Sequence, residues 1–160
     1  MRRGDALQTI QRGETLADAA RKMEEHRVSA LPVVDENRRV VGIVSERDVA
    51  RKSEQECETE SLKTLQAPLV FLSRDTSAED LSRLAQGFSQ VGRTRVEEVM
   101  TKDVIKVDEE DPVETLLQQM DEREVNHIPV VRGENLTGIV ARQDIVSGLA
   151  NLSRQKPDLL

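Results

Sequence analysis

Apolar side chains recur along the chain in a pattern that occurs twice. In each place they follow the spacing i, i+3, i+4, i+7, which is typical of a helix that buries one face. The positions are Leu16, Ala19, Ala20 and Met23 in the first place and Val113, Leu116, Leu117 and Met120 in the second. Each residue of the second set lies 97 positions after its counterpart, so the pattern indicates an internal repeat.

Two apolar segments follow each predicted helix, and we expect both to be strands. The first is a nearly continuous apolar run that contains a proline, Leu31 to Val34 and Ile128 to Val131. A polar turn then leads to the second segment, Val40 to Val44 and Leu136 to Val140. The turn is one residue shorter in the second copy, and turns are where such changes are tolerated.

The remaining parts of each copy complete the order strand, helix, strand, strand, helix. A short extended segment comes first, Leu7 to Ile10 and Val104 to Val107, and a second helix begins near Asp48 or Asp144. One copy of about 50 residues is small for an independent core. We therefore expect an α+β fold in which two β-α-β-β-α repeats pack face to face about a pseudo-two-fold axis.

The starts of the two first helices differ in sequence. In the second copy Asp111 is a candidate cap, and Pro112 suits the first turn. The first copy offers Thr15 and Asp18, a looser version of the same signal. The sequence therefore predicts the better-defined helix start in the second copy.

A segment outside the repeat separates the two copies. We expect repeats at 5–52 and 96–150, a partly helical insert at 53–95 and a frayed tail at 151–160. Within the insert, a capping box that begins at Thr76 predicts a short helix. We interpret the insert as a linker packed on the outside, with a docking element for a partner as the alternative.

Composition narrows the class of protein. Of the 160 residues, 37% are hydrophobic and 33% are charged, and no apolar run reaches the length of a membrane span. The net charge of −7 and the lack of Trp and Tyr argue against nucleic acid as a partner. The single cysteine, Cys57, excludes an internal disulfide and a multi-cysteine zinc site. With no signal-peptide pattern at the start, we expect a cytoplasmic location.

A short motif stands at the junction between the last strand and the last helix of each copy. It reads Gly-Ile-Val-Ser-Glu-Arg-Asp from Gly42 to Asp48, and Gly-Ile-Val-Ala-Arg-Gln-Asp from Gly138 to Asp144. Gly42 permits close approach of the backbone, and Ser45 lies where a helix N-terminus can receive a phosphate. Asp48 can accept both hydroxyl protons of a ribose. The motif therefore suits a nucleotide.

The same residues permit a simpler interpretation. Ser45 and Asp48 also form the pattern of a capping box, which would serve only the helix. In the second copy Ala141 replaces the serine while Asp144 remains, so the acid is present there without a reciprocal cap. Both interpretations stay open at this point. An anionic ligand would also need local positive potential in an acidic protein. The candidates for it are Arg47, Arg142 and His127.

Two copies of the proline strand and of the Gly-to-Asp junction, in the same order of elements, resemble a tandem pair of CBS domains, also called a Bateman module. The name comes from cystathionine beta-synthase, and the resemblance covers most of the chain outside the insert. It implies a stand-alone regulatory protein that binds an adenosine-containing nucleotide, most of all AMP, ADP or ATP, between its repeats. It also implies homodimers in which two pairs form a disc of four repeats.

The resemblance further implies two clefts, each of which combines the Gly-to-Asp junction of one repeat with the strands of the other. The primary cleft would contain Gly42, Ile43, Val44, Ser45, Arg47, Asp48, Thr101, Val104, Ile105, Asn126, His127 and Pro129. The second would contain Leu7, Gln8, Ser29, Ala30, Pro32, Gly138, Arg142 and Asp144. Because Ala141 lacks a hydroxyl, we expect the second cleft to bind more weakly.

Three classes of function follow from these observations. The first is a sensor that binds a nucleotide and relays its occupancy to an unidentified protein or to another subunit. The alternative is a dimerisation scaffold whose clefts are empty or vestigial. An enzyme is not expected, because the sequence offers no nucleophile–base–acid set and no Walker-type loop. For the same reason we expect no catalytic cofactor and no metal.

Overall fold

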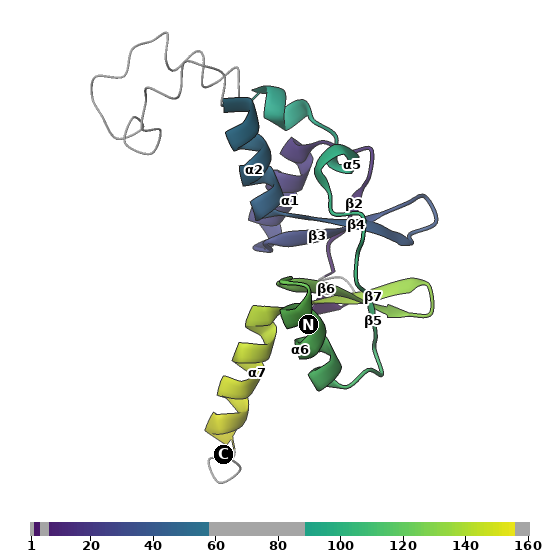
Figure 1. Ribbon diagram of the computed structural model, residues 1–160, viewed down its shortest axis with the longest axis vertical. Coiled ribbons are helices and arrows are strands. Elements are labelled where there is room, and N and C mark those ends of the chain that lie inside the picture. Colours follow the sequence, from purple (N-terminus) through teal and green to yellow (C-terminus); the bar gives the residue numbers. More distant parts are fainter. Residues whose placement is uncertain (1, 4–6, 58–88, 156–160) are drawn as a thin grey trace, which may run out of the picture. The chain divides into compact units, whose positions relative to one another are not determined.

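The structure, a computed structural model, describes residues 2–3, 7–57 and 89–155 of the chain (Figure 1). The helix predicted after Thr76 and residues 156–160 of the predicted tail lie outside these ranges. The described ranges contain the strands and helices of both repeats.

The first repeat contains three strands and two helices. In chain order they are β2 (Ile10–Gln11), α1 (Leu16–His26), β3 (Ala30–Val34), β4 (Val40–Ser45) and α2 (Glu46–Cys57). The strands form one sheet in the order β2-β3-β4, and α1 contacts α2.

The second repeat follows a short helix, α5 (Val96–Val99). In chain order its elements are β5 (Val107–Asp108), α6 (Val113–Glu122), β6 (His127–Arg132), β7 (Asn135–Ala141) and α7 (Arg142–Gln155). Its sheet has a fourth strand from the start of the chain, β1 (Arg2–Arg3), and the order is β1-β7-β6-β5. Figure 1 shows α6 and α7 on the same side of this sheet.

The observed order of elements confirms the predicted α+β fold with two β-α-β-β-α repeats. The first strand of each repeat is shorter than expected, because only the last residue of each predicted extended segment, Ile10 or Val107, pairs in a sheet. Val104 and Ile105 line a pocket instead of pairing with a neighbouring strand.

The two repeats fold alike in local detail. The N–H of Glu46 at the start of α2 donates to the Ser29 carbonyl at 3.0 Å. The counterpart in the second repeat is the N–H of Arg142 at the start of α7, which donates to the Asn126 carbonyl at 2.9 Å. The sequence repeat is therefore a structural repeat, down to the hydrogen bond that joins the last helix to the start of the proline strand.

The proline strands lie at the centre of the core. Every residue of β3 is buried, and Leu31 is 0% exposed. In β6, Ile128 is also 0% exposed and belongs to one hydrophobic cluster with Met120 of α6 and Val107 of β5. Burial on both faces explains the nearly continuous apolar run, since a strand with one solvated face would alternate apolar and polar residues.

Internal contacts divide the chain into two compact units. The first comprises Met1–Thr9, Pro32–Ile43 and Thr101–Leu160, and the second comprises Ile10–Leu31 and Val44–Met100. The division passes through β3 and β4 and therefore does not coincide with the division between the repeats.

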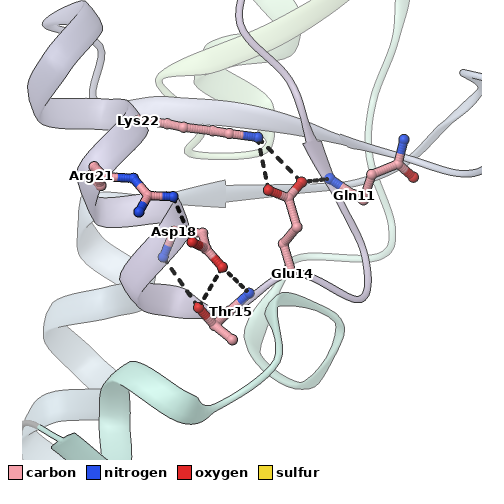
Figure 2. A network of polar contacts seen from close by, with 6 residues as sticks. All are labelled: Gln11, Glu14, Thr15, Asp18, Arg21 and Lys22. Carbon is pink, nitrogen blue, oxygen red and sulfur yellow. Dashed lines mark hydrogen bonds and ion pairs between the residues drawn. The ribbon is translucent and has the colours of Figure 1, made fainter.

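Polar side chains hold the start of α1 (Figure 2). The Thr15 hydroxyl accepts a hydrogen bond from the Asp18 N–H at 3.2 Å, and the Asp18 carboxylate accepts from the Thr15 N–H and hydroxyl at 3.2 and 2.7 Å. Arg21 pairs with the other carboxylate oxygen at 2.7 Å. Hydrogen bonds from the Thr15 side chain and backbone hold the pKa of Asp18 below its ordinary value of 3.8, and Arg21 adds to this effect.

The better-defined helix start is thus in the first repeat, contrary to the prediction. Thr15 and Asp18 form a complete capping box. In the second repeat Pro112 occupies the N-cap of α6, and Asp111 accepts the Asp108 N–H at 2.8 Å. Asp111 stands one residue before the N-cap, so its carboxylate closes the preceding turn instead of capping the helix.

Replacing Asp18 with alanine should destabilise the protein at pH 7 by about 1 kcal/mol, the usual effect of losing a cap. A carboxyl group whose pKa is lowered by folding stabilises the folded state above its ordinary pKa, and this stabilisation is lost as the pH falls below that value. The difference between wild type and Asp18→Ala should therefore shrink between pH 5 and pH 3, as urea unfolding would measure. Glu25→Ala, also on α1, is the control, and an Asp18 effect that is independent of pH would contradict the prediction.

Candidate functional site

A pocket of about 250 Å³ lies in the unit that contains the second repeat. Its walls are mainly aliphatic, and its polar groups include a carboxylate, a guanidinium and an imidazole. The lining residues are Ile43, Thr101, Asp103, Val104, Ile105, Arg123, Val125 and His127. All of them belong to the same compact unit, although Ile43 comes from a strand of the first repeat.

Hydrogen bonds between β4 and the segment before β5 fix one wall of this pocket. Ile43 and Thr101 form an isolated antiparallel bridge, in which each N–H donates to the carbonyl of the other at 3.0 and 2.9 Å. This bridge anchors the extended segment that carries Val104 and Ile105. Ile43 of the first repeat and Val104 and Ile105 of the second therefore lie on the same wall of the pocket.

The opposite part of the lining comes from the chain between α6 and β6. Arg123 is the C-cap of α6, and the next residue, Glu124, has a positive φ of 52°. A left-handed residue commonly ends a helix and turns the chain away from its axis. Arg123, Val125 and His127 then follow at every second position, and all three line the pocket.

Five residues predicted for the primary cleft line this pocket, namely Ile43, Thr101, Val104, Ile105 and His127. Sequence reasoning missed Asp103, Arg123 and Val125. A signal was present for Val125 alone, which precedes His127 by the two positions that put extended residues on one face, whereas Arg123 still belongs to the end of α6. Asp103 adjoins Val104, but its position in a bend gave no comparable signal.

Ser45 and Asp48 belong to the other compact unit. One carboxylate oxygen of Asp48 accepts the Ser45 N–H at 2.9 Å and the Ser45 hydroxyl at 2.7 Å. The other oxygen accepts from the Arg51 guanidinium at 3.1 Å. Asp48 is 8% exposed and is a buried charged residue. The helix-capping interpretation thus describes real contacts, and only the oxygen that accepts from Arg51 keeps a lone pair for a further donor.

The junction of the second repeat keeps the backbone contact of this set. The Asp144 carboxylate accepts the Ala141 N–H at 2.9 Å, as Asp48 does from Ser45, but no hydroxyl is present. Arg142 pairs with Asp121 of α6 at 2.9 Å, in an exposed position. Arg142 therefore ties α7 to α6 and is less available to an anion than the sequence suggested.

The other residues predicted for the clefts differ in exposure. Gly42, Val44 and Pro129 of the primary set are buried, as are Ala30, Pro32 and Gly138 of the second set. Leu7 and Gln8 are half-buried, whereas Ser29, Arg47 and Asn126 are exposed. The buried members can shape a cleft through their backbone, and the exposed ones have side chains that solvent reaches.

In the residues that the structure describes, no three or more His, Cys, Asp and Glu side chains are placed to hold a metal ion. Among the described helices, none combines the length and the apolar character needed to cross a bilayer.

Comparisons with known proteins agree with this architecture. The CBS domain matches two stretches of the chain, residues 1–54 and 96–151. A putative acetoin utilization protein (AcuB) from Vibrio cholerae has a structure with a TM-score of 0.68 and 26% identity, over 99% of this chain and 92% of that one. The structure of CBSX2 in complex with AMP has a TM-score of 0.66 over 96% of this chain and 94% of that one, and its 21% identity shows the fold alone.

Sequence relatives differ widely in length. A 17.7 kDa protein of Acidianus ambivalens, described as uncharacterized, is 29% identical over 139 residues, which are 86% of this chain and 64% of that protein. The chain spans only 21% to 33% of the length of three further curated relatives. This chain therefore matches parts of much longer proteins as well as proteins nearer to its own size.

Proposed function

Because the chain belongs to the CBS domain family, we propose that it is a regulatory module that binds an adenine nucleotide, with AMP, ADP or ATP as the candidate ligands. The observation that carries the proposal is the pocket between Ile43 and His127, which has aliphatic walls and a few polar groups. Binding sites for small ligands have this composition. The AMP complex of CBSX2, a protein of the same fold, supports adenine nucleotides as the ligand class.

The size of the pocket suits one part of a nucleotide. Sites for whole drug-sized ligands measure roughly 300–1,000 Å³, and this pocket measures about 250 Å³. Aliphatic side chains such as Val104 and Ile105 offer a dry surface to a flat base. The proposed role of the pocket is therefore to hold the base.

In the other compact unit, Ser45 and Asp48 have groups that suit a ribose and a phosphate. Ser45 ends β4, two residues after the pocket residue Ile43 on the same strand. Asp48 keeps one lone pair, on the oxygen paired with Arg51, that can accept a ribose hydroxyl. Ser45 lies next to the N-terminus of α2, where an anion is favoured. Arg47 on the first turn of α2 is exposed and can add positive charge.

We propose a weaker second site at the junction of the second repeat. Ala141 has no hydroxyl, and Arg142 is paired with Asp121. The equivalent of His127 in the first repeat is Ala30, which is buried and uncharged. The second site thus has fewer groups for a phosphate, which favours one strong site in each chain.

The proposed module acts through its ligand and not through catalysis. A ligand that binds one arrangement of the module better than another shifts their populations, and a partner or subunit can sense that shift. The regulated partner is a separate protein or a further part of a longer chain. The alternative function is a scaffold with empty clefts, which the missing hydroxyl at Ala141 favours.

We also propose that the chain forms homodimers through α6 and α7. Three large apolar side chains on these helices are exposed, Val113 by 59%, Leu117 by 37% and Val146 by 54%. Leu16, the counterpart of Val113 in the first repeat, is 1% exposed. An apolar helix face that water reaches is a common mark of a protein interface.

Thermal unfolding with single ligands tests the proposed function. AMP, ADP, ATP, S-adenosylmethionine and NAD would each be added alone to the full chain. A ligand present at about 100 times its Kd stabilises the folded state by roughly 2.7 kcal/mol. We expect an adenine nucleotide to raise Tm, and unchanged melting with all five compounds would favour the scaffold.

A further inference from the structure

Two oppositely charged side chains line the pocket, Asp103 and Arg123. Asp103 lies in the bend between Thr101 and Val104, and Arg123 caps the C-terminus of α6. Among the described residues, neither side chain has a hydrogen bond or an ion pair to another residue, although opposite charges attract each other. Both side chains are therefore available to a ligand in the pocket.

A pocket that holds only a base has little use for net charge. The formal charges of the carboxylate and the guanidinium cancel. The lining therefore offers one strong acceptor and one strong donor without a large field. Such a pair can distinguish the edges of bases, because a carboxylate only accepts hydrogen bonds and a guanidinium only donates them.

We propose that Asp103 and Arg123 select adenine over hypoxanthine and guanine at this site. This inference rests on the proposed function and adds to it the residues that set base specificity. Adenine presents an amino group beside a ring nitrogen, which are a donor and an acceptor next to each other. Asp103 accepts from the amino group, and Arg123 donates to N7, the ring nitrogen on that edge, which is an acceptor in hypoxanthine and guanine as well.

The same geometry disfavours a 6-oxo purine. Hypoxanthine has an oxygen in place of the amino group, so a carboxylate acceptor would face a second acceptor. An asparagine in the same position can turn its amide N–H towards that oxygen. The choice between the two bases should therefore depend on Asp103, whereas Arg123 contributes to the binding of both.

Asp103 and Arg123 could also serve only the stability of the folded protein, and the experiment has to distinguish this role from base selection. A cation at the C-terminus of α6 interacts favourably with the helix dipole whatever the ligand is. Asp103 is exposed, and in this role its charge would only keep the bend hydrated. A stabilising role of this kind would change Tm, but it would leave the ratio of affinities for two bases unchanged.

Calorimetric titration of the full chain with AMP, IMP and GMP tests the inference. A hydrogen bond to a charged group contributes about 1.5 kcal/mol or more, so wild type should bind AMP at least about tenfold more tightly than IMP. Asp103→Asn should bring this ratio close to one. Arg123→Gln should weaken AMP and IMP by similar factors. The control, Glu110→Gln, makes the same change of charge outside the pocket lining and should leave the ratio as in wild type.

Each outcome has a definite meaning. If wild type binds AMP and Asp103→Asn retains the full preference for AMP over IMP, base selection by Asp103 is wrong while the nucleotide sensor stands. Tighter binding of IMP or GMP than of AMP by wild type also overturns the inference. If wild type binds none of the nucleotides of the binding tests, the proposed function fails, and the inference fails with it.

Discussion

Replacing Asp48 with alanine is expected to abolish the stabilisation by an adenine nucleotide and to destabilise the free protein at the same time. Asp48 accepts three hydrogen bonds within its own junction. Losing a buried, hydrogen-bonded carboxylate of this kind costs about 1–2 kcal/mol. The nucleotide effect should disappear as well, because the proposed acceptor of the ribose hydroxyls is gone. Melting curves with and without AMP measure both effects.

Asp144→Ala is the matched control for this experiment. Asp144 occupies the same place in the second repeat and accepts the equivalent backbone N–H at 2.9 Å. Its loss should therefore lower Tm through the same local contact, yet leave most of the stabilisation by AMP. If Asp48→Ala and Asp144→Ala lower Tm and both retain the AMP effect, Asp48 serves only its helix. If only Asp144→Ala loses the AMP effect, the nucleotide binds at the second junction.

Replacing Leu117 with glutamate is expected to convert the proposed dimer into monomers. A charge placed in an apolar interface has no partner and loses its hydration, which costs several kcal/mol. Each 1.4 kcal/mol is a factor of ten in affinity, so the dimer Kd should rise at least about a hundredfold. Leu117 is 37% exposed and shares a helix face with Val113, four residues earlier. Sedimentation velocity over a range of concentrations measures the change.

The neighbouring helix α7 provides a second pair of variants. Val146→Glu should also favour monomers, because Val146 is 54% exposed and apolar. Ser147→Glu is the control, since adjacent residues of a helix do not share a face. Wild type that sediments as a monomer at all concentrations would refute the dimer. Equal effects of Val146→Glu and Ser147→Glu would point to general repulsion and not to an interface.

Much of the fold was predictable from the sequence because the same pattern occurs twice. A single apolar run around Leu31 fits a strand or a buried helix, but its recurrence around Ile128, each time after a helical stripe, leaves one order of elements. The proline strands are buried on both faces, which is why their apolar run is continuous. The structure confirms this order.

Local details were less predictable, because a short sequence pattern does not determine what each side chain contacts. Asp111 and Pro112 together look like a strong helix start, yet the carboxylate of Asp111 is used by the turn before α6. Ala20 fits the apolar stripe of α1 but is exposed, because a helix stripe does not specify how wide its buried face is.

The residues of the candidate site were also only partly predictable from the sequence. Ile43 was predicted from the Gly-to-Asp motif, and His127 was predicted from the family resemblance because it stands just before the proline strand. Asp103 and Arg123 were not, because a charged residue in a bend or at a helix end is usually only solvated. Their place in one pocket depends on the bridge between Ile43 and Thr101 and on the left-handed Glu124, which no local pattern indicates.

The strand at the very start of the chain has a consequence for how the protein is made. Arg2 and Arg3 pair with Ile139 and Gly138, and Thr101 bridges to Ile43, so each sheet ends on residues that belong to the other repeat's part of the chain. Contacts of such long sequence separation form late and slow folding. On the ribosome, β1 would wait until Gly138 and Ile139 had emerged. Neither repeat can therefore be excised without leaving an open sheet edge behind.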